Sequence, residues 1–579
     1  MGENASRLKL EAAPKAYEGE QDKARAPEET VAWVRERFAS MGHDVLRQVM
    51  RIDTGRLGIP VYISICGDEA KGVIGTQKQM GKGAAPAQAE ASALMELAER
   101  FSFFSFIKSD GFPWLTAPEA GPQAMDFAQA AKAVHHPPED LARAKAVFDL
   151  LPQRWAWARN LGAGRDERLP LSWFYAINEY NGPAAGNCLE EAVLQSLCEV
   201  VERHVSAVVT LEKRPTPAID PDSVTDPVAA GLIAKFMGAG IKVYLKDFTC
   251  DMGIPSVAAL CYDPSTFPAS SEIVYAAGTA TSPAMALVRA LTEVAQLAGE
   301  FNTHTSYKVS ALPKFAQLED ASYVTEAAGT VALDSLPNLS APDFRDEVMN
   351  CVGALEDRGY SVYCLNATHP ELQVPAVYTI VPGAHFAYRT TGTDVVFHAA
   401  KAASQLPDPL QALAVLNQML EEAGQTYYLE FFRGLALMAL ERPGEALASL
   451  DAALGLNPPS SDEASIHTHR GAALKDLGRY DEAKTALGRA ASFRDPHSEV
   501  FNLLGFCHYM LKEHEMAIEA FGRAIELEPG LAINYANIGS NLRELGQFKE
   551  ACQMYEHALE LDPGLGFARD NLEKLRQKL

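Results

Sequence analysis

The strongest constraint on the fold is a repeat that begins near Leu406 and runs through the C-terminal part of the chain. Strand-like alternation of apolar residues stops there, and a helical periodicity replaces it. Each unit has a glycine in its first helix, a small alanine in its second helix and a closing proline. The glycines are Gly434, Gly471, Gly505 and Gly539, the alanines are Ala446, Ala483, Ala517 and Ala551, and the prolines are Pro458, Pro496, Pro529 and Pro563. The last two glycine intervals are 34 residues long. A fixed period of this length predicts stacked helix pairs around one continuous core.

The first interval is longer because a polar insertion around residues 459–462 lies between helices, where added residues cost little. Segments such as Leu477–Ala483 and Ala524–Pro529 closely resemble tetratricopeptide repeats. The resemblance implies an all-α solenoid over residues 406–579, with a C-terminal capping helix and a concave surface for a peptide or helix of a protein partner. A second interpretation is that the array only supports the preceding domain or a dimer.

The residues before Leu406 have a different pattern. Runs such as Val61–Ile65 and Val243–Leu245 predict strands, and alanine-rich helical segments lie between them. We therefore predict an α+β domain over residues 46–400. Residues 1–45 are predicted to be a partly disordered N-terminal extension, because the first twenty-odd residues crowd charged side chains together with little apolar material.

Charge and cysteine content exclude several classes of protein. The formal net charge of the 579-residue chain is −24, which argues against a nucleic-acid partner because such partners require clustered Lys and Arg. The nine cysteines are scattered without a CxxC pair, so we predict reduced and mostly buried thiols. No apolar run approaches the length that spans a bilayer, and the polar N-terminus has no signal-peptide core. We expect a cytoplasmic protein with no membrane partner.

Three predicted helices of the α+β domain carry the same polar pattern. Offsets of 0, 4 and 7 residues place the members of each set on one helix face. The sets are Ser92, Glu96 and Glu99; Gln195, Glu199 and Glu202; and Arg289, Glu293 and Gln296. The other positions are mostly Ala, Leu, Val and Met, so these helices are predicted to be largely buried.

Clustered carboxylates in apolar surroundings require cations, because their mutual repulsion otherwise raises their pKa values or destabilises the fold. Glutamates without a matching His or Cys cluster favour Mg²⁺ over Zn²⁺, and proteins commonly hold magnesium with a few carboxylates and the phosphates of a substrate. The alternative is that Glu99-Arg100 and Glu202-Arg203 form only local ion pairs. Three sets at matched spacing favour the metal site.

The segment from Gly75 to Gly83 superficially resembles a phosphate-binding P-loop. Five residues instead of four separate Gly75 from Gly81, and Gly83 replaces the Ser or Thr whose hydroxyl would bind magnesium. We therefore reject a P-loop. Lys82 remains a candidate for a phosphate contact, and a solvated loop lysine is the alternative.

Glycines precede each polar set: Gly81-Lys82-Gly83, Gly186-Asn187 and Gly278. With Leu57–Pro60 and Asp247–Pro255, these motifs resemble the YcaO family over residues 53–382. In that family acidic helices surround ATP, and glutamates hold magnesium against its phosphates. The resemblance implies metal binding by Glu96, Glu99, Glu199, Glu202 and Glu293. It implies nucleotide or phosphate binding by Ser92, Lys82, Asn187, Glu191, Arg203 and Arg289, with Arg203 and Arg289 also stabilising charge on the transferred group.

The resemblance implies an enzyme that uses ATP to phosphorylate a backbone-amide oxygen of a peptide or protein substrate. An attacking side chain then gives an azoline (the cyclodehydratase reaction), and a sulfide source gives a thioamide. Azoline-forming members typically end in a proline-rich tail, and this chain ends at Lys578-Leu579. We therefore expect thioamidation rather than azoline formation. The alternative is an accessory factor or adaptor, for example in methylthiolation of a ribosomal protein. Stand-alone relatives also suggest a homodimer.

Overall fold

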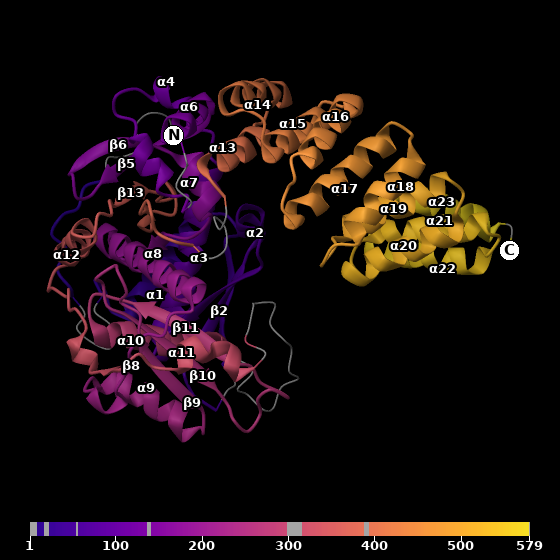
Figure 1. Ribbon diagram of the computed structural model, residues 1–579. Coiled ribbons are helices and arrows are strands. Elements are labelled where there is room, and N and C mark those ends of the chain that lie inside the picture. Colours follow the sequence, from indigo (N-terminus) through magenta and orange to yellow (C-terminus); the bar gives the residue numbers. More distant parts are fainter. Residues whose placement is uncertain are drawn as a thin grey trace. The chain divides into compact units, whose positions relative to one another are not determined.

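The computed structural model describes residues 8–16, 23–53, 56–135, 140–297, 315, 317–386, 393–577 and 579. The chain divides into two compact units (Figure 1). The first unit comprises residues 1–137 and 152–394, and the second comprises residues 138–151 and 395–579. The first is an α/β unit with three sheets, and the second consists of helices. The predicted fold class, an α+β domain followed by an all-α array, is confirmed.

The three sheets of the first unit are small. The first has the order β1-β2-β3, with strands Leu46–Arg51, Val61–Cys66 and Lys78–Lys82. The second has the order β11-β10-β9-β8-β12, with strands Val274–Thr279, Ser256–Tyr262, Lys242–Asp247, Ala218–Ile219 and Thr330–Val331. The third has the order β4-β5-β13-β14-β7, and β6 pairs with β5. Its strands are β4 (Trp114–Leu115), β5 (Gln153–Asn160), β13 (Tyr363–Asn366), β14 (Ala376–Ile380), β7 (Pro183–Ala185) and β6 (Arg165–Pro170).

Each sheet supplies one strand that leads into a long helix with a polar set. Strand β3 precedes α3 (Pro86–Lys108), β7 precedes α8 (Leu189–Glu212), and β11 precedes α10 (Pro283–Leu297). Alanine and leucine dominate the buried faces of these helices, and Pro86 and Pro283 occupy their first turns, where a missing N–H costs nothing. Three strand-to-helix units therefore converge from three sheets, which is what brings the polar sets together.

The glycines that precede the polar sets have a steric function. A Cβ atom on Gly81 would collide with the α3 backbone at Ala89 and Ala93. A Cβ atom on Gly278 would collide with the α10 backbone at Ala286 and Ala290. Gly186 lies in the same way against the first turn of α8. Each glycine thus lets its strand pack directly on the following helix, which fixes how far the carboxylates reach into the site.

The N-terminal part of the chain packs against the first unit. Leu8 belongs to the same buried cluster as Val200 and Val377, and helix α1 (Pro27–Ser40) buries Val34 and Phe38 against residues of α3. The described residues of the predicted extension, 8–16 and 23–45, thus contribute to the packing of the first unit. Residues 1–7 and 17–22, on which part of that prediction falls, lie outside the described residues.

The helices of the second unit stack as successive pairs along the chain (Figure 1). It begins with α13 (Val395–Ser404) and α14 (Pro409–Ala423), and it ends with the capping helix α23 (Gly566–Arg576). Between them lie the pairs α15/α16 (Tyr427–Ala439, Pro443–Gly455), α17/α18 (Ser460–Asp476, Tyr480–Ala491), α19/α20 (Ser498–Met510, His514–Leu527) and α21/α22 (Ala532–Glu544, Phe548–Leu561). The recurrent glycines face the second helix of their own pair, for example Gly505 against Phe521.

Helix α6 (Leu141–Leu150) belongs to the second unit although the first unit surrounds it in sequence. It packs against α13 and α14 and buries Val147 and Phe148. A chain truncated after residue 394 is therefore expected to melt at a lower temperature than a chain truncated after residue 424, because burial of each such side chain contributes about 1.5–3 kcal/mol. Thermal unfolding of the two truncated chains tests this prediction, and equal melting temperatures would contradict the assignment of α6.

His398 on α13 gives the second unit a predicted pH dependence. Its side chain is buried, and burial, with a smaller effect of Lys401, lowers the pKa of His398 to about 4. At pH values between this value and the ordinary value of 6.5, the unfolded chain binds a proton at His398 that the folded chain does not bind. The free energy of unfolding therefore falls as the pH decreases. We expect a loss of up to about 3 kcal/mol between neutral pH and pH near the lowered pKa. Urea unfolding of wild type and His398→Gln measures it; the variant should lack this contribution.

All nine cysteines are free, and seven of them are buried, as the sequence predicts. Among the helices that the structure describes, none combines the length and the apolar character needed to cross a membrane.

Candidate nucleotide and metal site

A cavity of 480 Å³ lies where α3, α8 and α10 converge. All eleven residues that the sequence singled out line it: Lys82, Ser92, Glu96, Glu99, Asn187, Glu191, Glu199, Glu202, Arg203, Arg289 and Glu293. The volume is within the range of small-ligand sites. Six carboxylates and seven basic side chains surround this space.

The carboxylates of α3 share one arginine of the same helix. The Nε of Arg100 lies 3.0 Å from Oε1 of Glu96 and 3.4 Å from Oε1 of Glu99. The side chain of Glu99 is only 9% exposed, and its Oε1 accepts no hydrogen bond from any described residue. The local ion pairs that were the alternative interpretation therefore exist on α3, but they leave a buried carboxylate oxygen without a hydrogen-bond donor.

The carboxylates of α8 have looser ion pairs. Glu199 lies 3.8 Å from Arg203 on the same helix, and Glu202 lies 3.5 Å from Arg289 of α10. The backbone N–H of Thr279, at the end of β11, donates to Oε2 of Glu202 at 3.1 Å.

On α10, Arg289 donates from Nη1 to Oε1 of Gln195 at 2.7 Å. Its Nε is buried and has no hydrogen-bond partner among the described residues. Lys82, at the end of β3, forms an ion pair with Glu293. The third polar set is thus joined to the second set through Arg289 and to β3 through Glu293.

Burial shifts the proton affinities of these groups. Burial, and then the neighbouring Glu96, raises the pKa of Glu99 well above its usual value. Burial also raises the pKa of Glu199, although Arg203 and Arg100 oppose this effect. Burial lowers the pKa of Lys82 to about 8, against the opposing attraction of Glu202. Carboxylates with raised pKa values and a lysine with a lowered pKa are typical of a buried site whose charges are not fully compensated. Further charged ligands would compensate them.

The residues fit magnesium held together with phosphates. In the part of the chain that the structure describes, no group of three His, Cys, Asp or Glu side chains is already positioned to hold a metal ion by itself. Magnesium usually takes only one or two carboxylates and completes its coordination with water and substrate phosphates. Glu99, with its buried oxygen that accepts no hydrogen bond, and the loosely paired Glu199 and Glu202 are donors of this kind.

The structure adds two basic residues and one hydroxyl residue that the sequence analysis missed. Lys23, Arg25 and Thr30, from the predicted extension, also line the cavity. Lys23 Nζ lies 3.2 Å from Oε1 of Glu191, and the N–H of Ala24 donates to Oε2 of the same carboxylate at 3.1 Å. Glu191 therefore anchors the N-terminal segment in this structure. The pairing of Lys23 and Ala24 with a residue more than 160 positions away has no local signal in the sequence.

Asn187 connects α1 to this cluster. Its Nδ2 lies 3.2 Å from both carboxylate oxygens of Glu191, and its Oδ1 accepts a hydrogen bond from the Thr30 hydroxyl at 2.8 Å. The Arg25 guanidinium lies over the ring of Trp33, 4.1 Å from its centroid. The N-terminal segment thus forms one wall of the cavity.

Comparison with known proteins defines the class. A family model described as "YcaO cyclodehydratase, ATP- and Mg²⁺-binding" matches residues 80–385. Tetratricopeptide-repeat models match residues 464–495, 498–531 and 532–565. The fold is that of a class of ATP- and Mg²⁺-binding proteins. Because the family model covers more than half of the chain, the chain belongs to the YcaO family, with ATP and Mg²⁺ as the cofactors of that family.

The relatives are distant in sequence. The chain is 28% identical over 385 residues to an uncharacterised protein of Methanothermobacter thermautotrophicus, a match that covers 62% of this chain and 93% of that protein. It is 29% identical over 220 residues to an uncharacterised protein from the tfuA 3′ region of Rhizobium leguminosarum bv. trifolii, covering 35% of this chain and 51% of the other.

Two solved structures are similar to the chain. A heterocyclase in complex with substrate and cofactor has a TM-score of 0.54 at 23% identity, and the match covers 66% of this chain and 55% of the heterocyclase. This chain therefore spans only about half of that enzyme, and the likeness shows the fold. The YcaO protein of Methanopyrus kandleri bound with AMPPCP and Mg²⁺ has a TM-score of 0.49 at 24% identity, covering 64% of this chain and 94% of the other.

The position of Lys23 gives a direct prediction. Lys23→Ala is expected to weaken binding of ATP with magnesium by about tenfold, because it removes one cation from the cavity and leaves the buried Glu191 carboxylate less well compensated. Calorimetric titration with ATP measures the effect. Lys71→Ala, which removes a half-buried lysine of α2 (Asp68–Ile74) outside the cavity, is the control. Equal affinities for all three proteins would contradict a contribution of the N-terminal segment to the site.

Proposed function

We propose that the chain uses ATP and Mg²⁺ to phosphorylate the oxygen of a backbone amide in a peptide or protein, and that sulfide then replaces this oxygen to give a thioamide. The observation that carries the proposal is the convergence of six carboxylates from three helices on one cavity, with a raised pKa for Glu99 and Glu199. Such a site stabilises a metal-bound polyphosphate better than an uncharged ligand.

We assign the metal to Glu96, Glu99, Glu199, Glu202 and Glu293. Ser92, Lys82, Asn187, Glu191, Arg203 and Arg289 position the nucleotide. Arg203 is the most available cation among these, since its side chain is 53% exposed and its ion pair with Glu199 is loose, at 3.8 Å. Arg203 and Arg289 stabilise the negative charge that develops during phosphoryl transfer, which is mostly a matter of positioning and electrostatics.

In the proposed reaction the sulfur nucleophile forms a bond to the carbonyl carbon. The amide oxygen forms a bond to the γ-phosphorus of ATP as the bond from this phosphorus to the leaving oxygen breaks, and ADP is released. The carbon–oxygen bond then breaks, phosphate leaves, and the thiocarbonyl remains. An amide oxygen is a poor leaving group, so phosphorylation is the step that makes the exchange feasible. Thioamidation and azoline formation share this phosphorylation step and differ in the nucleophile, and sulfide is the nucleophile in this proposal.

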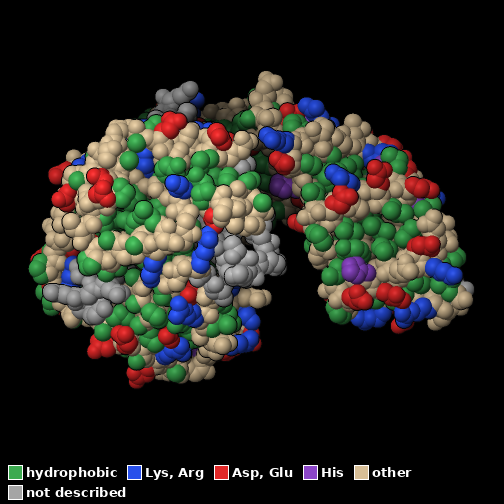
Figure 2. Space-filling model, turned by 90° about the horizontal axis from the view of Figure 1, so that it is seen from below, with side chains coloured by type: hydrophobic (Ala, Val, Ile, Leu, Met, Phe, Trp, Pro, Cys, Tyr) green, Lys and Arg blue, Asp and Glu red, His purple; other side chains and the backbone are tan. Residues whose placement is uncertain are grey.

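The helical unit recruits the protein partner in this proposal. Figure 2 shows hydrophobic side chains gathered among charged ones on the surface of this unit. Phe506 and Met510 of α19 are 39% and 42% exposed, on the first helix of a repeat. Stacked repeats present such side chains to a peptide or helix.

Product analysis tests the reaction. The purified chain is incubated with ATP, Mg²⁺, a sulfide donor and polypeptides retained by the protein, and mass spectrometry follows the polypeptides. Exchange of one oxygen for sulfur supports thioamidation, whereas loss of water without sulfide indicates an azoline. ATP binding without turnover in the presence of a bound partner supports the alternative, an accessory factor such as one for ribosomal-protein methylthiolation. A homodimer stays a prediction that light scattering can test.

A further inference from the structure

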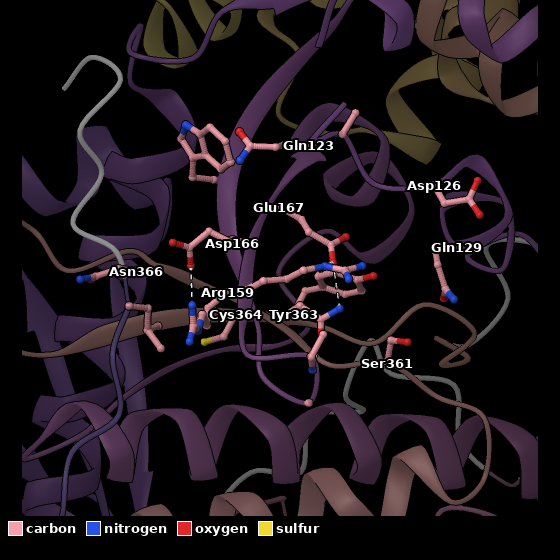
Figure 3. A pocket seen from close by; sticks show the side chains of 18 of the residues that line it. Gln123, Asp126, Gln129, Arg159, Asp166, Glu167, Ser361, Tyr363, Cys364 and Asn366 are labelled. Carbon is pink, nitrogen blue, oxygen red and sulfur yellow. Dashed lines mark hydrogen bonds and ion pairs between the residues drawn. The ribbon is translucent and has the colours of Figure 1, made fainter. Parts of the chain in front are cut away.

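A second and larger cavity, of 1460 Å³, lies in the first unit on the third sheet, and its lining includes none of the predicted site residues (Figure 3). Strands β5, β6 and β13 contribute its walls, together with the segment before α5 (Phe127–Ala131) and the end of α12 (Phe344–Glu356). The volume exceeds the usual range of about 300–1,000 Å³ for small-ligand sites. The space is therefore large enough for a segment of polypeptide.

The cavity lies where two strands separate. Strand β5 pairs with β13 only through Asn160 with Tyr363 and Arg159 with Cys364. Beyond this point β13 continues its ladder with β14 through Leu365 and Asn366, without β5. Trp157 of β5 and Asn366 of β13 line the cavity beside this separation. Strands that separate in this way offer edges to an extended chain, which is a common mode of peptide recognition.

The walls carry more acidic than basic side chains. The acidic residues are Asp126, Asp166, Glu167 and Glu356, and the basic residues are Arg159 and Arg165. Both arginines are already paired, Arg159 with Asp166 at 3.3 Å and Arg165 with Glu167 at 2.9 Å. In Figure 3 the Arg159 side chain points toward Asp166, and Asp126 lies apart from this pair.

Two carboxylates remain without an ion-pair partner among the described residues. Asp126 accepts only the N–H of Ala128, at 3.4 Å, and Glu356 has no side-chain hydrogen bond or ion pair within the described part of the chain; both residues are exposed, so they are accessible to a ligand from solvent. Glu356 lies against Gly162, where a Cβ atom would collide with its carboxylate. The glycine thus leaves room for an acidic group at the cavity wall.

The cavity also contains a polar acceptor that no described residue satisfies. The amide oxygen of Gln129 lines the cavity, is buried, and has no hydrogen-bond partner among the described residues. A buried acceptor without a donor is costly, and a peptide N–H or a lysine ammonium would satisfy it.

We propose that this cavity binds an extended segment of the substrate polypeptide that carries Lys or Arg side chains, at a distance from the amide that reacts. The inference rests on the proposed function, because a backbone-modifying enzyme must hold a long polypeptide beyond the reacting group. Asp126 and Glu356 bind the basic side chains, and Gln129 accepts a hydrogen bond from the segment. Binding energy from such a remote contact positions the reacting amide.

The test uses the full chain and a fluorescent peptide of about ten residues, long enough to extend for about 33 Å, with Lys alternating with Gly and Ser. Fluorescence anisotropy gives its affinity for wild type, for Asp126→Asn/Glu356→Gln, and for the control Glu36→Gln, which removes an exposed carboxylate of α1. ATP binding is measured on the same samples, so that failure of the nucleotide site is recognised separately.

We expect the double variant to bind the basic peptide at least about tenfold more weakly, and the control to bind as wild type does. A peptide with Glu in place of Lys should not bind. The inference is overturned if the basic peptide fails to bind while ATP binds, if the double variant binds it as tightly as wild type, or if the acidic peptide binds equally well. It is also overturned if spermidine displaces the peptide at concentrations equal to the peptide's own dissociation constant, since the ligand is then a small polycation.

Discussion

The Glu199→Gln/Glu202→Gln protein is expected to lose magnesium-dependent ATP binding, with an affinity at least about 100-fold below that of wild type, or about 2.8 kcal/mol. Glutamine keeps the volume and the hydrogen-bonding length of each side chain but not its charge. The backbone N–H of Thr279 can still donate to the amide oxygen at position 202. The expected loss therefore reports the carboxylate charge rather than a change of shape.

The same variant has a distinctive behaviour without magnesium. Arg203 and Arg289 lose their carboxylate partners and become more attractive to phosphates. ATP binding in the presence of a chelator should therefore be equal to or stronger than that of wild type, whereas addition of magnesium should no longer help. Calorimetry with and without Mg²⁺ measures both effects. The control is Glu212→Gln, since Glu212 lies at the end of the same helix with its side chain 53% exposed. An unchanged magnesium dependence in a folded double variant would contradict the assignment of these ligands.

Gly278→Ala is expected to destabilise the first unit by about 3 kcal/mol, which is the upper part of the usual range for added volume in a packed core. The new methyl group collides with the backbone of α10 at Ala286 and Ala290, which cannot turn away as a side chain could. It also meets the Cβ atom of Arg289, so α10 must shift and carry Arg289 and Glu293 with it. ATP affinity should fall together with stability.

Gly72→Ala is the matched control for this substitution. Gly72 lies inside α2, and nothing lies within 4 Å of a Cβ atom built there. Alanine in a helix is more favourable than glycine by roughly 0.5–1 kcal/mol, so the control should be slightly more stable than wild type. Urea unfolding measures both variants. If Gly278→Ala unfolds at the same urea concentration as wild type, the close contact between β11 and α10 does not stabilise the first unit.

The candidate site could be predicted because its information is local. Offsets of 0, 4 and 7 residues fix which side chains share a helix face, and three helices with the same offsets suggested one common site before any tertiary structure was known. Glu96, Glu199 and Glu293 indeed line one cavity. The glycine before each set was visible in the sequence, but its steric function depends on the helix that packs against it.

Other features depend on how distant parts of the chain meet. The polar composition of the first residues gave no indication that Lys23 and Thr30 would line the 480 Å³ cavity, because their contacts are with the distant residues Glu191 of α8 and Asn187, which precedes α8. Helix α6 packs with the second unit, and no pattern within residues 141–150 points to those partners. The separation of β5 from β13 follows from strand pairing across some 200 residues, which periodicity cannot reveal.

The most direct measurement follows the amide oxygen itself. Polypeptides retained by the protein are prepared with oxygen-18 in their backbone carbonyls and incubated with the purified chain, ATP, Mg²⁺ and sulfide. Proposed amide phosphorylation predicts ADP and phosphate in equal amounts, with one labelled oxygen in each phosphate formed, and no turnover by Glu199→Gln/Glu202→Gln. Phosphate without the label would show that water, not an amide, receives the phosphoryl group, and this result would contradict the proposed enzyme.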